Sequence, residues 1–219
     1  MIEKTTIISI MRRNRDASQL VADKVKRRIY RRGRSSVFTA DDFADIGSRA
    51  SIDLALSRLA AKGTIKRIAR GLYLYPREDP ELGVAAPTVD EISRALAEAG
   101  RMRIQPSGAY AANILGLSEQ VPMKIVFLTD GSSRRVKVEG REIIFKWAAP
   151  RTMAAAGRLG GLVIQALRHL GRDAVNDELL GRLRTVVPEE KRREVLKDAL
   201  SAPAWIRTVL RIALSENHA

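Results

Sequence analysis

Apolar residues recur at helical spacing through the first third of the chain. Residues 18–32 have apolar side chains at helical spacing with basic residues between them, which predicts a first helix, and Gly33 ends it. The same spacing predicts a short helix over residues 40–46 and a longer one over residues 48–62, which begins at the N-cap Ser48. The apolar stripe that turns the longer helix toward the other two consists of Ile52, Leu56 and Leu59.

The pattern then changes to strict alternation. Residues 64–68 and 72–75 alternate apolar and polar side chains, and Ala69-Arg70-Gly71 between them favours a hairpin with glycine in its turn. Two helices followed by a hairpin with a basic tip is the element order of a winged helix-turn-helix, which places one helix in the DNA major groove. We therefore predict such a module over residues 18–78, after an N-terminal arm at residues 1–17.

The second part of the chain predicts a separate α+β domain over residues 88–219. The preceding residues 79–87 contain proline, glycine and acidic side chains and indicate a linker. Asp130-Gly131 and Glu139-Gly140 are typical hairpin turns and predict a small antiparallel sheet, followed by a helical bundle. Helices are expected at residues 89–99 and 108–115, and strands at residues 102–105, 124–129, 134–138 and 142–147. Residues 150–215 have a helical pattern that is expected to break at Gly160-Gly161, Gly171, Pro188 and Pro203. The predicted fold class of the whole chain is α+β.

The charge of the chain favours an anionic partner. The net charge is +14, and residues 1–80 hold 18 Lys and Arg against 9 Asp and Glu. Per residue, that basic excess is about three times the excess in the remaining 139 residues. Together with the predicted winged helix-turn-helix, this charge makes double-stranded DNA the predicted partner. There is no cysteine, which agrees with a cytoplasmic location, and no apolar run approaches the ~20 residues that cross a bilayer, so no membrane partner is expected.

The helix at residues 48–62 and the following hairpin contain the residue types that DNA recognition needs. Arginine binds guanine bidentately in the major groove, serine donates or accepts, and basic side chains of a hairpin neutralise phosphates. Asp53 either accepts from cytosine or pairs with Arg49 one turn earlier, and the pair is the favoured interpretation. The predicted DNA-binding residues are Arg49, Ser51, Ser57, Arg58, Lys62, Lys66, Arg67 and Arg70. Five further arginines form either a phosphate clamp or a solvated face: Arg27, Arg28, Arg31, Arg32 and Arg34.

Motifs in both halves resemble one family. Thr39–Phe43 and Leu56–Tyr73 are similar to the N-terminal winged helix of AbiEi-type antitoxins of type IV toxin–antitoxin systems. Pro106–Leu117, Gln120-Val-Pro and Phe127–Gly131 resemble the domain that follows it in one branch of that family. The resemblance implies an N-terminal domain that binds operator DNA and represses its own operon. It also implies a C-terminal domain that counteracts a nucleotidyltransferase-like toxin encoded nearby, without a cofactor.

Two other functions remain open from the residues. One is a winged-helix regulator whose C-terminal domain dimerises or senses a ligand. The other is a metal-dependent nuclease built from Asp130 with Glu139 or Glu142, although turn chemistry already explains Asp130-Gly131. We expect no enzyme, with no catalytic residue and no metal site. Trp147 and Trp205 are either interface anchors or core residues, and the core is the favoured interpretation.

Overall fold

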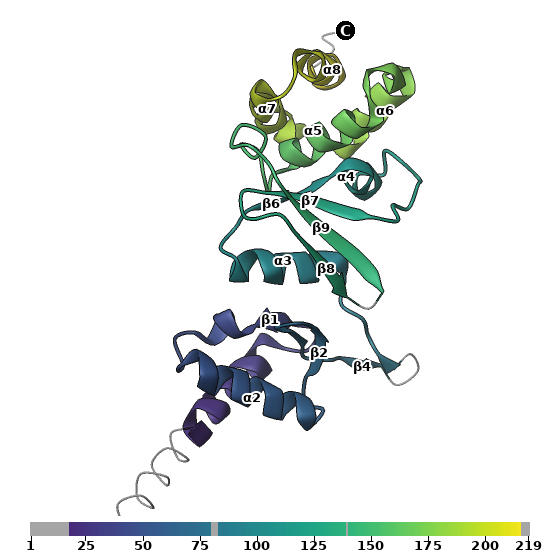
Figure 1. Ribbon diagram of the computed structural model, residues 1–219. Helices are drawn as coiled ribbons and strands as arrows, with labels where there is room; N and C mark the ends of the chain where they lie inside the picture. The colour runs from purple at the N-terminus through teal and green to yellow at the C-terminus, as the bar shows by residue number, and fades with distance from the viewer. Residues whose placement is uncertain (1–17, 80–82, 139, 216–219) are drawn as a thin grey trace, which may run out of the picture. The chain divides into compact units, whose positions relative to one another are not determined.

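The computed structural model describes residues 18–79, 83–138 and 140–215 (Figure 1). The predicted N-terminal arm, residues 1–17, and Glu139 of the nuclease hypothesis lie outside the described residues. The chain divides into two compact units, one that ends at Ala99 and one that begins at Gly100. Each contains helices and strands, so the predicted α+β class is confirmed.

The first unit contains the predicted helices and hairpin at close to their predicted bounds. Its three-stranded antiparallel sheet has the order β1-β3-β2. The helix expected at residues 40–46 is a single 3-10 turn, because Thr39 and Asp42 form a capping box around it and the chain turns again before Gly47. In chain order the elements are a helix at residues 18–32, β1 (Val37–Thr39), η1 (Ala40–Phe43), α2 (Arg49–Ala61), β2 (Lys66–Ala69) and β3 (Leu72–Leu74).

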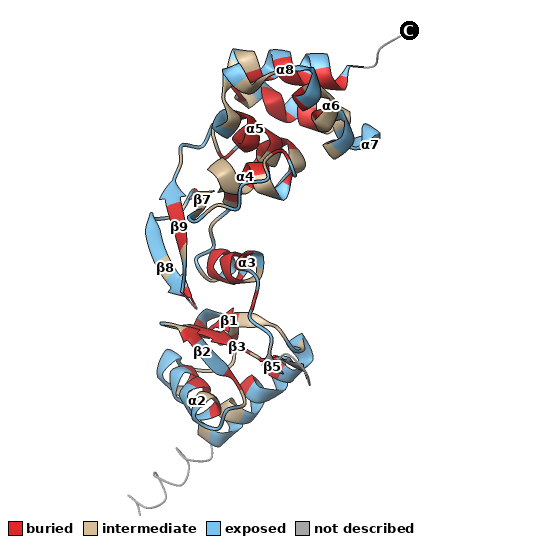
Figure 2. Ribbon diagram, turned by 90° about the vertical axis from the view of Figure 1, so that its right-hand side faces the viewer, coloured by how far each residue is buried: buried red, intermediate tan, exposed pale blue. Residues whose placement is uncertain are grey.

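One hydrophobic core fixes the orientation of α2. The predicted stripe is confirmed, since Ile52, Leu56 and Leu59 are all buried. They belong to a core in which the rings of Phe38 and Phe43 pack edge to face at 5.6 Å. Because this face of α2 is buried, the opposite face is turned outward, as the pale blue residues of α2 in Figure 2 show.

The segment expected to be a linker contains a second small hairpin, β4 (Glu78–Asp79) with β5 (Gly83–Val84). It is followed by α3 (Val89–Ala99), where the Glu91 carboxylate and the Thr88 hydroxyl form a capping box. Sequence reasoning assigned this helix to the second domain. It packs against β1 and belongs to the first unit.

The sheet of the second unit is mixed, and the expectation of a wholly antiparallel sheet is wrong. Its strand order is β6-β7-β9-β8, and β7 runs parallel to β9. Asp130-Gly131 does not close a hairpin, because β9 lies between β7 and β8 in the sheet. The Asp130 carboxylate instead accepts hydrogen bonds from the backbone and side chain of Arg103, both at 2.8 Å. In chain order the sheet and its helix are β6 (Ile104–Ser107), α4 (Gly108–Ile114), β7 (Ile125–Thr129), β8 (Arg134–Val138) and β9 (Arg141–Trp147).

The remaining helices share one apolar core with α4. Gly160 and Gly161 do not break a helix; they lie in the first turn of α5, where neighbouring groups approach closely. The buried Asp198 carboxylate lies against Gly160 and pairs with Arg158 at 2.5 Å, so a negative charge occupies the positive end of this helix. The elements are α5 (Leu159–Leu170), η2 (Arg172–Ala174), α6 (Asp177–Val186), α7 (Glu189–Asp198), η3 (Ala199–Ser201) and α8 (Ala204–Leu214).

Candidate nucleic-acid interface

The outward face of α2 is a continuous exposed stripe along the helix. Its residues follow the spacing of one helical face opposite the core stripe. Two of the predicted DNA-binding residues, Ser57 and Arg58, lie in the middle of it. The side chain of Leu54 lies on this face as well and is exposed. The full stripe consists of Ala50, Asp53, Leu54, Ser57, Arg58 and Ala61.

Arg49 and Ser51, at the start of α2, already have protein partners. The Arg49 guanidinium donates to Asp53 at 3.0 Å and to Asp41 at 2.9 Å, which confirms the favoured Arg49–Asp53 pair. The hydrogen bond and charge of Asp53, with a smaller contribution from Asp41, raise the pKa of Arg49. The Ser51 hydroxyl donates to the Ser48 carbonyl oxygen at 2.8 Å. A base contact by Arg49 therefore requires that its ion pairs open.

The β2–β3 hairpin lies directly after α2 and presents Arg70 at its tip. Ala69 pairs with Leu72, so Arg70 and Gly71 form the turn, and Gly71 takes a φ of 72° that glycine adopts without strain. Arg67 and Arg70 are exposed, and so is Lys66, which has an interaction of its own. Tyr73 is buried and stacks on Phe38 at 6.3 Å, which places it in the hairpin core rather than on a base-stacking surface.

The second half of α2 and the hairpin form a cationic segment without carboxylates. From Leu54 to Arg77 the chain holds six Lys or Arg and no Asp or Glu. Arg58, Arg67 and Arg70 form no ion pair or side-chain hydrogen bond with the part of the chain that the structure describes. Four carboxylates of the unit pair with other arginines. Asp41 and Asp53 bind Arg49, and Asp42 and Asp45 bind arginines of the first helix.

Three of the five arginines in the hypothetical clamp have structural roles. Arg28 binds the Asp45 carboxylate through two hydrogen bonds of 2.5 and 2.7 Å, and the hydrogen bond from Arg28 lowers the pKa of Asp45 to about 2. Arg32 pairs with Asp42 at 2.6 Å. Arg34 donates to the Pro76 carbonyl oxygen at 2.8 Å. Arg27 and Arg31 are exposed instead.

The structure offers little to the nuclease hypothesis. Asp130 is held by Arg103, whose hydrogen bonds lower the pKa of its carboxylate. Glu142 lies 3.9 Å from Arg135. Within residues 18–79, 83–138 and 140–215, no three His, Cys, Asp or Glu side chains gather in a geometry for a metal ion.

The two tryptophans of the second unit differ in their surroundings. Trp205 packs against the apolar core at partial burial. Trp147, at the end of β9, is 61% exposed, so the expectation of a core position is wrong for it. None of the helices in the described ranges has both the length and the hydropathy that a membrane crossing requires.

Comparison with known proteins identifies a matching family and a structural neighbour. The profile described as "Family of unknown function (DUF6088)" matches residues 23–195. No curated protein matches the chain. The crystal structure of the RV2827C protein from Mycobacterium tuberculosis aligns over 92% of this chain and 83% of that one, with 16% identity and a TM-score of 0.41.

Proposed function

The chain belongs to the family of unknown function DUF6088, and we propose that its first unit binds double-stranded DNA through α2 and the β2–β3 hairpin. The protein acts in this proposal as a transcriptional repressor at its own operator. Its action as a repressor needs no catalytic group, only differential affinity for one DNA sequence.

The arrangement of elements supports this proposal. The first unit has a helix, a strand, a short helical turn, a second helix and a hairpin, with the sheet order β1-β3-β2. This order is compatible with the winged helix-turn-helix that the proposal assigns to it. The exposed stripe of α2 then enters the major groove, where Ser57 and Arg58 contact base edges. The hairpin lies along the backbone, and Arg70 at its tip is placed for the adjacent minor groove.

The observation that carries the proposal is the exposed positive charge of Arg58, Arg67 and Arg70, which form no ion pair with the described part of the chain. Elsewhere in the unit, carboxylates pair with Arg28, Arg32 and Arg49. On the segment from Leu54 to Arg77 there is no acidic residue at all. Cations that the protein leaves without partners gain most from DNA phosphates, whose condensed counterions are released on binding.

Replacing Arg58 by alanine tests the proposal. We expect the full chain to bind a duplex from upstream of its own gene more tightly than a scrambled duplex. In Arg58→Ala that preference falls by about 1–3 kcal/mol, because one bidentate base contact is lost. Fluorescence anisotropy with both duplexes measures it. Arg207→Ala, which removes an exposed arginine of α8, is the control and should leave the preference unchanged. Wild-type protein that binds neither duplex at low salt contradicts the proposal.

The second unit supports a further proposal, the antitoxin role implied by the resemblance to AbiEi-type antitoxins. Large apolar side chains are turned outward there: Trp147 is 61%, Val121 83% and Met123 98% exposed. Exposed aromatic and methionine side chains are typical anchors of protein interfaces. A nucleotidyltransferase-like toxin encoded nearby is the proposed partner. Both roles belong to the cytoplasm, the location expected from the sequence.

Co-expression with the neighbouring gene product tests the antitoxin role. The wild-type chain is expected to relieve the growth arrest that the product causes. Trp147→Ala is expected to relieve it less, because an interface anchor is removed. Arg58→Ala is the control and should relieve it fully, since Arg58 lies in the other unit. Absence of any relief by the wild-type chain favours a regulator without antitoxin activity.

A further inference from the structure

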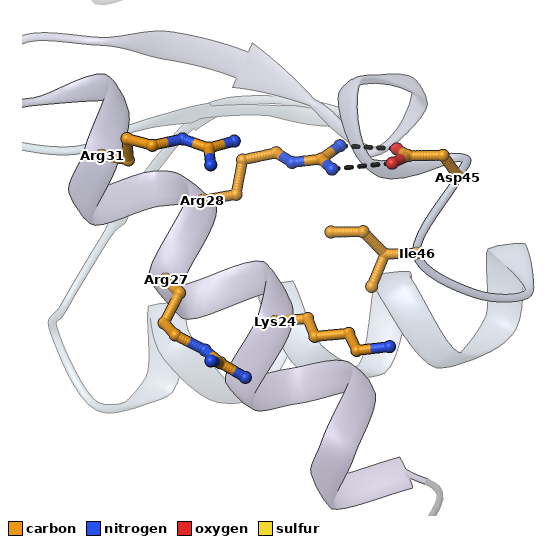
Figure 3. Close-up of a pocket in the computed structure, with 6 residues that line it drawn as sticks. All are labelled: Lys24, Arg27, Arg28, Arg31, Asp45 and Ile46. Carbon is orange, nitrogen blue, oxygen red and sulfur yellow. Dashed lines mark hydrogen bonds and ion pairs between the residues drawn. The ribbon is translucent and has the colours of Figure 1, made fainter.

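One flank of the first helix borders an open depression that the proposed interface does not use (Figure 3). The depression has a volume of about 600 Å³. The helix contributes four cations to it, and the loop before α2 forms the opposite wall. The lining residues are Lys24, Arg27, Arg28, Arg31, Asp45 and Ile46.

The four cations lie on one face of the helix, at positions i, i+3, i+4 and i+7. Like charges at these spacings destabilise a helix. Among the described residues that line the depression, Asp45 is the single carboxylate, and it binds Arg28 through two hydrogen bonds, as the dashed lines in Figure 3 show. Arg28 also donates to the Asp42 carbonyl oxygen at 3.0 Å. Arg28 is therefore a structural residue that fixes the loop.

The other three cations have no carboxylate partner in the described part of the chain. Lys24, Arg27 and Arg31 form no ion pair or side-chain hydrogen bond with the described part of the chain. The nearest other carboxylate on the helix, Asp23, accepts a hydrogen bond from the Gln19 amide at 3.2 Å. Sequence reasoning grouped Arg27 and Arg31 with Arg32 and Arg34 and missed Lys24, although the spacing in the chain already indicates it.

We infer that Lys24, Arg27 and Arg31 form a second phosphate-binding site for duplex DNA, separate from α2 and the hairpin. The inference rests on the proposed function. Seven residues of helix span about 10 Å, and each DNA strand carries one phosphate per ~3.4 Å of axis, so the row of cations matches about three phosphates of one strand. These side chains lie outside the α2 stripe that is proposed to read base edges and are assigned to phosphates, so the site adds affinity without sequence preference.

The experiment measures the salt dependence of DNA binding by the full chain that carries Lys24→Gln, Arg27→Gln and Arg31→Gln. We expect affinity for the operator and the scrambled duplex to fall by the same factor, about one to two orders of magnitude at 0.15 M salt. The slope of log K against log salt falls by about 2 to 3. The operator preference is expected to stay unchanged. Circular dichroism before the titration verifies that the variant is folded.

A control removes the same charge from the second unit, through Arg168→Gln, Arg207→Gln and Arg211→Gln, all of which are exposed. An equal loss of affinity in this control overturns the inference, because it assigns the effect to net charge. A first-helix variant that binds like wild type, while Arg58→Ala still loses its preference, also overturns it and leaves the proposed function standing. Wild-type protein that binds no DNA overturns both.

Discussion

A chain with Arg58→Gln, Arg67→Gln and Arg70→Gln is expected to lose about two orders of magnitude in affinity for any duplex DNA at 0.15 M salt. Each neutralised phosphate contributes about 0.9 to the salt slope, and Arg67 and Arg70 are the proposed phosphate contacts, so the slope is expected to fall by about 2. The reason lies in the structure of the interface: these three side chains are exposed and have no carboxylate partner among the described residues.

Anisotropy titrations at salt concentrations from about 50 to 300 mM measure this loss, because the affinity from phosphate contacts changes most steeply with salt in that range. The variant also loses operator preference, because Arg58 is the proposed base contact, and this distinguishes it from the first-helix variant, which keeps that preference. The second-unit control carries the same change in net charge and should bind like wild type. If the salt slope of this triple variant is unchanged, the DNA binds somewhere other than on α2 and the β2–β3 hairpin.

Gly161→Ala is expected to destabilise the second unit by about 3 kcal/mol or more. A Cβ atom at Gly161 would lie 2.2 Å from the Ala155 carbonyl oxygen and 2.7 Å from Oε1 of Gln105. The first of these is backbone, and the second belongs to a buried side chain that accepts a hydrogen bond from the Gly157 amide at 3.0 Å. Neither neighbour moves without disturbing the contact between α5 and β6.

Thermal unfolding followed by circular dichroism measures this effect, with an expected decrease in Tm of about 10 °C for a unit of this size. Gly181→Ala is the matched control, since a Cβ there meets nothing within 4 Å and the residue lies inside α6. We expect it to raise the stability by about 0.5–1 kcal/mol through helix propensity. A Gly161→Ala protein with the same Tm as the wild type contradicts the close packing at the start of α5.

The first unit was predictable because its signals are local. Ser48 accepts from the Ser51 amide at the start of α2, and Gly71 supplies the positive φ of the hairpin turn. Residues three or four apart on a helix are neighbours regardless of how the rest of the chain packs, so the Arg49–Asp53 pair is predictable from the sequence. Arg49 also binds Asp41, eight residues away, and that contact depends on how η1 packs beside α2.

In the second unit, local signals misled. Asp130-Gly131 has the composition of a hairpin turn, but turn chemistry does not specify which strand pairs with β7. The Asp130 carboxylate binds Arg103, 27 residues earlier in the chain, and this long-range contact replaces the expected turn. Trp147 was assigned to a core on residue type alone, and its position at the end of β9 leaves it exposed.

The sequence by itself determined the α+β class, the bounds of α2, the buried stripe of that helix and the acid-free basic segment that follows Asp53. These follow from helical periodicity, caps and composition, which act over a few residues. Only the tertiary structure decided that β7 is parallel to β9, that α3 belongs to the first unit and which cations keep a carboxylate partner. Those outcomes depend on contacts between residues distant in the chain, and a carboxylate neutralises the arginine that folding brings within a few ångströms of it.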